Sequence, residues 1–334
     1  MITYYITGLT GFVGKNVLLQ LEKTSDFHIV TLVLPHEKEV EFINKPYITI
    51  VVGNILNKED VLKFVSTPGE GDKVLLHIAG RVTTLKRGDQ LTMDINFNGT
   101  KNIVDSVNEV GDYKKLVYVS SVDAMERIKD GEIKEVSYYE VDKAVGVYSK
   151  SKALSNNYII KNAKVNSSIV LPSAIMGSDD PNAAPINVAI KKYLNHKLPA
   201  ITKGGYNIVD VKDVARGILN AVSLGRDKES YFLTGQYISV KDLIGLAAEI
   251  NNSKPVKLIV PHFLIKMISP LVTLNAKIHA KTPLFTGFSM DCLKQNSNYS
   301  YKKAHDKLHY EPTDLKSSMK ETISWMKESG YLDK

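Results

Sequence analysis

Three glycines spaced three residues apart follow directly after the first apolar run of this chain. Met1–Ile6 form that run, and Thr7–Gly14 reads Thr-Gly-Leu-Thr-Gly-Phe-Val-Gly. Between a strand and a helix, Gly8 permits a tight turn, Gly11 a close approach of phosphates, and Gly14 close packing of the helix on the sheet. The pattern therefore predicts a pyrophosphate-binding turn, although it is G-x-x-G-x-x-G and not the usual dinucleotide fingerprint G-x-G-x-x-G.

Apolar strand-like runs alternate with helical patterns through the first 172 residues. The candidate strands are Ile2–Thr7, Phe27–Leu34, Tyr47–Val52, Lys73–Ile78, Lys114–Ser120 and Ser167–Leu171. The candidate helices, with apolar residues three and four apart, are Phe12–Lys23, Lys58–Val65, Thr92–Glu109 and Val147–Asn162. Strands that are apolar along most of their length and alternate with helices predict an α/β fold with a doubly wound parallel sheet.

The pattern becomes less regular after Pro172. It predicts a turn at Lys203–Gly205 and one further strand at Tyr231–Leu233. The helices that it predicts are Val188–Asn195, Val214–Val222, Val240–Ile250, Tyr301–Leu308 and Leu315–Lys327. We expect residues 1–172 to form a nucleotide-binding domain to which residues 206–236 return. Residues 173–205 and 237–334 are then expected to form a smaller mixed lobe that binds substrate.

Composition limits the partners and the compartment. The formal net charge is +7, but basic and acidic residues are interspersed, so we expect an anionic small molecule and no nucleic acid. Cys292 is the single cysteine, which excludes an intrachain disulfide and fits a reducing cytoplasm. The chain opens directly into a strand with no secretory signal, so a cytoplasmic location is expected.

One apolar segment, Leu258–Leu274, is interrupted by Pro261, His262, Lys266 and Pro270. A bilayer span needs about 20 apolar residues, so we expect a packed or substrate-covering helix and no stable membrane insertion. His305 and His309 are four residues apart but have no evident third ligand, so no metal site is predicted.

Small and polar residues follow three of the predicted strands. These are His77-Ile78-Ala79-Gly80, Ser120-Ser121 and Pro172-Ser173. In a parallel sheet the carboxyl ends of the strands share one edge, where ligands bind. We therefore expect these residues to lie near the glycine turn, with His77 as a hydrogen-bonded residue at a strand end and not as an acid or base.

Tyr148 and Lys152 lie four apart on a predicted helix and so share one face. A phenol has a pKa of about 10, and a neighbouring ammonium lowers it, so such a pair can exchange a proton with a carbonyl or alcohol oxygen near neutrality. Ser121 could hydrogen-bond the same oxygen. With 17 tyrosines in the chain, the spacing alone is equally compatible with an amphipathic helix and a solvated lysine.

An ordered set of motifs resembles the extended short-chain dehydrogenase/reductases over nearly the whole chain. The motifs are Thr7–Gly14, His77–Gly80, Asn96–Thr100, Val119–Ser121, Tyr148–Lys152, Leu171–Ser173 and Val209–Ala215. The resemblance implies a Rossmann fold that binds NAD(P), a Ser/Tyr/Lys catalytic set and a C-terminal lobe over the substrate. It also implies a homodimer formed through the helices of Asn96 and Tyr148.

The same resemblance implies a role for individual residues. Tyr148 would be the acid/base, Lys152 would lower its pKa and hold the nicotinamide ribose, and Ser121 would position the substrate oxygen, with Ser120 as the alternative serine. Asn96 would order the cofactor site and Pro172 would support the nicotinamide. The remaining expected cofactor contacts are Gly8, Thr10, Gly11, Phe12, Val13, Gly14, His36, Asn54, Ile55, Ala79 and Gly80.

The choice of nicotinamide cofactor depends on the end of the second strand, which reads Leu32-Val33-Leu34-Pro35-His36-Glu37-Lys38. An NAD enzyme usually has a carboxylate at the end of this strand, and none is evident at the expected position. His36 or Lys38 could reach a 2′-phosphate. The sequence therefore favours NADP(H) over NAD(H).

Within the family, the chain is most similar to the dihydroflavonol-reductase and 3β-hydroxysteroid-dehydrogenase-like branch. The stretch Ala174–Ser178 lacks the Asn-x-Tyr-Gly-Pro pattern of nucleotide-sugar enzymes, and no Thr-Asp-Glu dehydratase signature replaces the serine pair. We expect an oxidoreductase acting on a carbonyl or secondary alcohol of a small molecule. The alternatives are a nucleotide-sugar epimerase or dehydratase with bound NAD, and a non-catalytic cofactor sensor.

Overall fold

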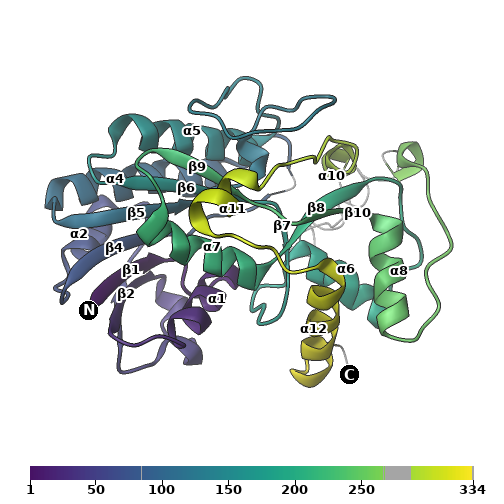
Figure 1. Ribbon diagram of the computed structural model, residues 1–334, viewed down its shortest axis with the longest axis horizontal. Coiled ribbons are helices and arrows are strands. Elements are labelled where there is room, and N and C mark those ends of the chain that lie inside the picture. Colours follow the sequence, from purple (N-terminus) through teal and green to yellow (C-terminus); the bar gives the residue numbers. More distant parts are fainter. Residues whose placement is uncertain (84, 266, 268–286, 333–334) are drawn as a thin grey trace.

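Seven parallel strands form the central sheet of the computed structural model, which describes residues 1–83, 85–265, 267 and 287–332. Their order is β3-β2-β1-β4-β5-β6-β9 (Figure 1). The strands are β1 (Ile2–Thr7), β2 (Phe27–Val33), β3 (Ile48–Val52), β4 (Asp72–His77), β5 (Tyr113–Val119), β6 (Ser167–Pro172) and β9 (Glu229–Leu233). The first six match the predicted strands to within one residue at each end, and the doubly wound α/β prediction is confirmed.

Helices cover both faces of this sheet and create two cores. One face carries α1 (Phe12–Leu21) and α7 (Val211–Leu224), and the other carries α2 (Lys58–Ser66), α4 (Gly99–Val110) and α5 (Val147–Asn162). Successive residues of β1 point to opposite faces, so Tyr5 joins the core under α2 and α4, whereas Tyr4 and Ile6 join the core under α1 and α7. Burial on both faces explains why the strands are apolar along most of their length.

The predicted helix Thr92–Glu109 is interrupted in the structure. A short helix α3 (Gln90–Met93) leads into a π-helical turn η3 (Asp94–Asn98), and α4 begins only at Gly99. A π turn adds one residue to the helix and is frequent at functional sites. Short 3₁₀ turns occur at η1 (Pro35–Glu37), η2 (Glu41–Ile43) and η4 (Val122–Ala124).

A smaller lobe of strands and helices lies beside the main sheet, as predicted, but the strands of this lobe were not predicted. A three-stranded sheet in the order β10-β8-β7 joins β7 (Ala174–Met176), β8 (Gly205–Asp210) and β10 (Gln236–Ser239). The helices α6 (Pro185–Leu194), α8 (Val240–Ile250) and α12 (Leu315–Glu328) pack around it and form a third core with Met176 and Ile208 (Figure 1). β7 and β10 are short, and β8 and β10 carry polar residues, so the periodicity of these strands is weak.

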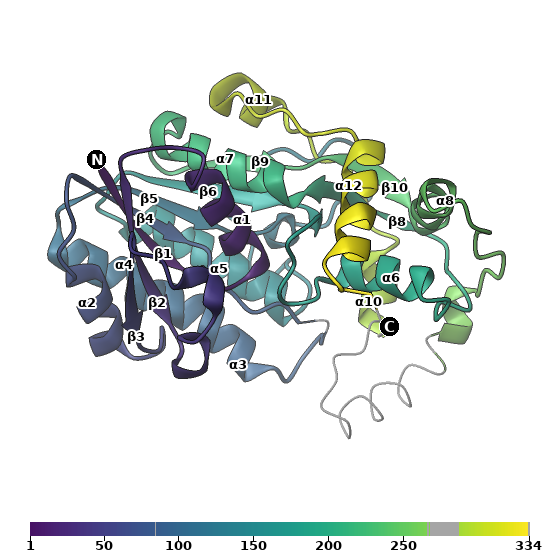
Figure 2. The same ribbon diagram turned by 90° about the horizontal axis from the view of Figure 1, so that it is seen from below.

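The C-terminal part of the chain contacts both units. After α10 (Gly287–Cys292), the helix α11 (Lys302–Leu308) packs on α7 and β9, and α12 then crosses to the small sheet (Figure 2). Of the predicted segment Leu258–Leu274, positions 266 and 268–274 lie outside the described residues. In the part of the chain that is described, no helix combines the length and apolar character required to cross a membrane.

Asp213 on α7 connects the main sheet to the segment that leads into α12. Its side chain is fully buried, and the Thr313 amide and hydroxyl donate to its carboxylate at 2.6 and 2.9 Å. Arg216 also pairs with this carboxylate. The contact attaches the segment before α12 to a helix of the main sheet.

We predict that Asp213→Ala lowers the free energy of unfolding by about 3 kcal/mol, because it removes a fully buried, charged acceptor of the two Thr313 hydrogen bonds and of the Arg216 ion pair. Urea denaturation followed by circular dichroism measures the change. Asp306→Ala, at an exposed position of α11, serves as the control and should unfold like the unmodified protein. Equal midpoints for Asp213→Ala and Asp306→Ala would contradict the prediction.

Candidate active site

The glycine turn between β1 and α1 has the close contacts that a phosphate cradle requires. Gly8 has a φ of +76°, and a Cβ there would lie 2.7 Å from the Ala79 amide nitrogen. A Cβ on Gly14 would lie 2.1 Å from the Gly8 carbonyl oxygen, so the first turn of α1 packs directly on the loop. A Cβ on Gly11 would lie 3.3 Å from the Gly8 carbonyl oxygen and 3.8 Å from Asn182 Nδ2, so this position is less tightly packed than Gly8 and Gly14.

The N-terminus of α1 is suited to an anion. Gly11 is its N-cap, no side chain caps the helix, and no acidic residue lies in its first turn, which contains Phe12 and Val13. The first amides of a helix lack partners within the helix and carry partial positive charge. The residues present therefore fit the pyrophosphate of a dinucleotide.

A carboxylate lies at the carboxyl end of β2, where the sequence analysis expected none. Glu37 ends the turn η1, and its Oε2 accepts from the Leu34 amide at 2.8 Å. Its Oε1 accepts from the Thr10 hydroxyl of the glycine turn at 2.7 Å. His36 is exposed beside it. The sequence did contain a signal, because Pro35 at the first position and Glu37 at the third are typical of a short helical turn that folds back on its N-cap.

Asn54 and Ile55 follow β3 at the same edge. The Asn54 amide donates to Asp60 at 2.8 Å, and its side-chain oxygen accepts from the Leu56 amide at 3.0 Å. Ile55 packs against Gly99 at the start of α4, where a Cβ would lie 3.1 Å away. This part of the edge is exposed at Asn54 and apolar at Ile55, which suits a flat base lying over it.

Asn96 lies in the π turn and holds three segments together. Its Oδ1 accepts from the Arg81 amide at 2.8 Å, and its Nδ2 donates to the Arg81 carbonyl at 3.0 Å and to the Ser151 hydroxyl at 2.9 Å. Its carbonyl accepts from Ser155 at 2.8 Å and from Thr100 at 2.5 Å. The loop after β4, which contains Ala79 and Gly80, is thereby fixed relative to α5.

Lys152 is buried, at 3% exposure, and its ammonium reaches the strand that ends in the serine pair. It donates to the Val119 carbonyl at 2.9 Å and to the Tyr118 hydroxyl at 3.1 Å, and lies 4.7 Å from the centre of the Tyr118 ring. A Cβ on Gly80 would lie 3.2 Å from the Lys152 Nζ, so the loop after β4 passes directly over the ammonium. No pattern in the sequence indicates the Tyr118 contact.

Tyr148 is half-buried one helical turn before Lys152, and its hydroxyl lies near the Ser121 side chain. Burial raises the pKa of Tyr148, the nearby Asp123 carboxylate raises it further, and the Ser121 hydrogen bond lowers it. The net shift is upward, opposite to the lowering expected from the Tyr/Lys spacing, because Lys152 is directed to Tyr118 and Val119. The Tyr148 hydroxyl therefore keeps its proton at neutral pH.

The two serines of the pair differ in their surroundings. Ser121 Oγ contacts Tyr148 and accepts from the Asp123 amide at 3.1 Å. The Ser120 hydroxyl is buried and has no hydrogen-bond partner among the described residues. Pro172 is buried at the end of β6, two strands from β4, and the Ser173 hydroxyl beside it is likewise without a described partner.

His77 is held in the neutral form at the end of β4. Its Nδ1 lies 2.8 Å from the Thr7 hydroxyl, and its Nε2 lies 2.9 Å from the Thr100 hydroxyl. Burial and then the Lys152 charge lower the pKa of His77 to about 3. The interpretation of His77 as a hydrogen-bonded residue at a strand end is confirmed.

This shift predicts that His77 makes the protein sensitive to acid. The unfolded chain binds a proton at His77 below about pH 6.5, whereas the folded chain does so only near pH 3, so stability falls as the pH drops between these values. From pH 7 to pH 5 the loss is about 2 kcal/mol. His77→Asn should reduce this pH dependence in urea unfolding. His196→Asn, on the surface, should leave it unchanged, and equal pH dependence in both variants would refute the assignment.

Comparison with known proteins places the chain among dehydrogenases and reductases by sequence. A sequence model of the 3-beta hydroxysteroid dehydrogenase/isomerase family matches residues 5–245. A putative dihydroflavonol 4-reductase of Synechocystis sp. is 27% identical over 341 residues, covering 98% of this chain and 96% of the relative. Sterol demethylase protein B of Methylococcus capsulatus is 23% identical over 341 residues, covering 99% and 100%. The crystal structure of gox2253 superimposes with a TM-score of 0.82 at 26% identity, covering 99% of both chains.

Proposed function

Because the chain belongs to the 3-beta hydroxysteroid dehydrogenase/isomerase family, we propose that it is an NAD(P)-dependent oxidoreductase that interconverts a carbonyl and a secondary alcohol. The observation that carries the proposal is the position of Tyr148 beside Ser121, at the sheet edge that also holds the glycine turn. The relative named as a dihydroflavonol 4-reductase supports the same class of reaction.

In this proposal each site residue has a defined task. When bound, the reduced nicotinamide supplies a hydride to the carbonyl carbon. The Tyr148 hydroxyl donates its proton to the carbonyl oxygen, and Ser121 holds that oxygen by a hydrogen bond. The Lys152 ammonium, held by Val119 and Tyr118 beside the loop of Gly80, would hold the nicotinamide ribose. The Tyr148 phenol is protonated at neutral pH, as a proton donor must be.

We predict that Tyr148→Phe lowers kcat/KM about 100- to 10,000-fold, since the proton donor is lost while the ring is kept. A screen of ketones, aldehydes and nucleotide sugars with NADH and NADPH supplies the substrate for the assay. Nicotinamide fluorescence should show cofactor affinity within about threefold of the unmodified protein.

Tyr138→Phe is the matched control, because Tyr138 is 62% exposed on a loop away from these contacts and should retain full activity. Retained turnover in Tyr148→Phe would refute the assigned role. Turnover of nucleotide sugars alone, with cofactor that copurifies, would instead identify the epimerase or dehydratase alternative.

For the cofactor, we propose NAD(H) in preference to NADP(H). The preference for NADP(H) in the sequence analysis depended on the lack of a carboxylate at the end of β2. Glu37 changes this argument, because its carboxylate hydrogen-bonds Thr10 of the glycine turn and the Leu34 amide. A carboxylate there can accept from ribose hydroxyls and repels a 2′-phosphate.

We therefore expect kcat/KM to be at least tenfold higher with NADH than with NADPH. Glu37→Gln should narrow this ratio about tenfold, because it removes the charge but keeps the side-chain shape. Glu39→Gln, an exposed neighbour, should leave the ratio unchanged. A preference of the unmodified enzyme for NADPH would overturn the assignment and restore the roles of His36 and Lys38.

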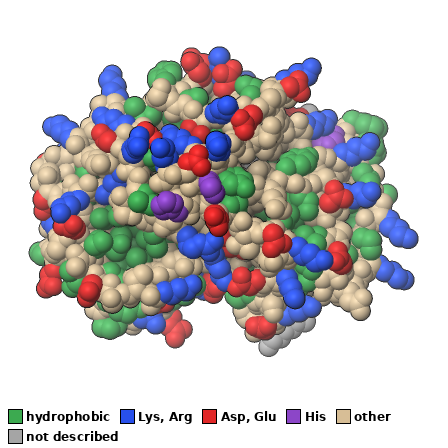
Figure 3. All heavy atoms as spheres, viewed as in Figure 1, with side chains coloured by type: hydrophobic (Ala, Val, Ile, Leu, Met, Phe, Trp, Pro, Cys, Tyr) green, Lys and Arg blue, Asp and Glu red, His purple; other side chains and the backbone are tan. Residues whose placement is uncertain are grey.

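We also propose the division into a nucleotide-binding domain of residues 1–172 with 206–236, and a substrate lobe of residues 173–205 and 237–334. The pairing of β9 with β6 and the packing of α7 on α1 support the return of this segment to the main sheet, although β8 pairs within the small sheet. A small-molecule partner and a cytoplasmic homodimer belong to the same proposal. Charges of both signs alternate over the face seen in Figure 3, as expected for a protein that does not bind nucleic acid.

A further inference from the structure

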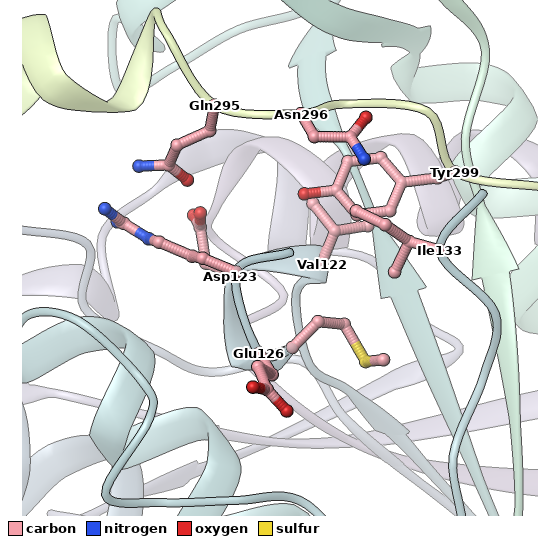
Figure 4. A pocket seen from close by; sticks show the side chains of 9 residues that line it. Val122, Asp123, Glu126, Ile133, Gln295, Asn296 and Tyr299 are labelled. Carbon is pink, nitrogen blue, oxygen red and sulfur yellow. The ribbon is translucent and has the colours of Figure 1, made fainter. Parts of the chain in front are cut away.

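The pocket beside the site is too small for a second organic ligand. Asp123, Gln295 and Tyr299 are among the residues that line it (Figure 4), and its volume is about 10 Å³. Such a volume holds about one water molecule. A larger partner would therefore have to bind on the surface of the protein, where the charges are unevenly distributed.

Two segments of the small lobe carry most of the excess positive charge of the chain. Residues 181–209 and 250–265 contain six lysines and no aspartate, glutamate or arginine. The formal net charge of the whole chain is +7, so the remaining sequence is close to neutral. The part of the surface formed by these segments therefore attracts anions more strongly than the rest.

The two segments are fixed side by side by their backbones. The Ile201 amide donates to the Leu258 carbonyl at 2.9 Å, and the Val260 amide donates to the Ile201 carbonyl at 2.8 Å. The carbonyl of Lys203 lies 2.9 Å from His262 Nε2. Residues 201–203 thus hold residues 258–262 in one position, and Lys203 lies at the junction of the two segments.

Apolar side chains project into solvent from the second segment. Residues 262–265 and 267 are helical, and Phe263 and Met267 are 63% and 71% exposed. Leu264 is also exposed, and spacings of three and four residues place these three side chains on one side of the helix. Leu258, just before the helix, is 60% exposed. Adjacent exposed apolar side chains of this size mark an interaction surface.

Lysines flank these apolar side chains. Lys203, Lys254 and Lys257 are exposed, and Glu249, the nearest acidic residue along the chain to Lys254, pairs with Lys316 of α12 at 2.8 Å. In Figure 2 the segment after α8 lies at the end of the small lobe that is remote from the main sheet. We call this the basic apolar surface, which consists of Lys203, Lys254, Lys257, Leu258, Phe263, Leu264 and Met267.

The combination of lysines and apolar side chains selects the partner. The phosphates of nucleic acid would satisfy the lysines but offer nothing apolar to Phe263 and Met267. A second copy of this chain, placed symmetrically on this surface, would bring the same lysines together and be repelled. An anionic bilayer offers phosphates at its surface and acyl chains directly beneath, so it matches both kinds of side chain.

We propose that the basic apolar surface attaches this protein reversibly to anionic phospholipid bilayers. Phe263 and Met267 enter the boundary between headgroups and acyl chains, and Lys203, Lys254 and Lys257 contact the lipid phosphates. The attachment is peripheral and requires no membrane-spanning helix. It does not depend on the proposed oxidoreductase activity.

Cosedimentation of the full chain with vesicles tests the proposal. We expect the protein to sediment with vesicles of phosphatidylcholine that contain about 30% phosphatidylglycerol, and to remain in solution with vesicles of phosphatidylcholine alone. Sodium chloride at about 0.5 M should release most of the bound protein, because it screens the lysine charges.

Two double variants separate the contributions of charge and apolar contact. Lys254→Glu with Lys257→Glu should weaken binding to the anionic vesicles about 25-fold or more, since each lysine near such a surface contributes about fivefold to the affinity. Phe263→Ser with Met267→Ser should weaken it about tenfold or more. Circular dichroism verifies that both variants are folded, and the vesicle comparison with the unmodified protein tests the proposal without them.

Lys320→Glu with Lys327→Glu is the matched control, because it makes the same change of charge at exposed positions of α12. This control should bind the anionic vesicles within about threefold of the unmodified protein, since α12 carries none of the proposed contacts. An equal loss of binding in the control and in the Lys254/Lys257 variant would overturn the proposal.

Three further results would also overturn it. The first is a lack of sedimentation with the anionic vesicles, or equal sedimentation with phosphatidylcholine alone. The second is a lower molecular mass of the Phe263/Met267 variant in analytical ultracentrifugation, which would identify the surface as an interface between copies of this chain. The third is tighter binding to a DNA duplex than to the anionic vesicles, which would assign the lysines to nucleic acid.

Discussion

The hydrogen bonds of the Asn96 side chain are the constraint on which the geometry of the site depends. The amide fixes the Arg81 backbone after β4 and the Ser151 hydroxyl on α5, so the loop of Gly80 and the helix of Tyr148 and Lys152 hold one relative position. The π turn makes this possible, because one extra residue rotates the preceding helical turn by about 100° relative to α4. A regular helix would direct the amide elsewhere.

Electrostatics at this edge follow from the same packing. The Lys152 ammonium is held by a carbonyl and a phenol of β5, and it contributes to keeping His77 neutral. Tyr148 instead lies near Asp123, so its proton is retained. The fixed Lys152 cation and the protonated Tyr148 phenol therefore lie one turn apart on α5. Lys152 contacts the last residues of β5, and Tyr148 lies beside Ser121, just after that strand.

Much of the fold could be predicted because buried parallel strands are apolar on both faces. The six predicted strands of the main sheet meet this condition, whereas β7 has 3 residues and β10 has 4, of which Gln236 and Ser239 are polar. The π turn could not be predicted, since the apolar spacing of Thr92–Glu109 is also compatible with a regular helix. Only the contacts of Asn96 with other segments select the wider turn.

The same distinction applies to the site. Spacing within one element predicts the glycine turn and the shared face of Tyr148 and Lys152. The position of Ser121 follows because the carboxyl ends of parallel strands share one edge of the sheet. The position of Glu37 depends on how the loop after β2 folds back. The Tyr118–Lys152 contact depends on which side chain of β5 points toward α5. No periodicity in the sequence encodes either of them.

The position of α11 has a consequence for the order in which the protein can fold during synthesis. Ala304, Leu308 and Tyr310 are buried in the same core as β1, α1 and α7, although about 300 residues separate them from the first strand. The main sheet thus lacks part of its own core until residues 304–310 have left the ribosome. Before that point, the nascent nucleotide-binding unit exposes an apolar groove along α7 and β9, which chaperones recognise.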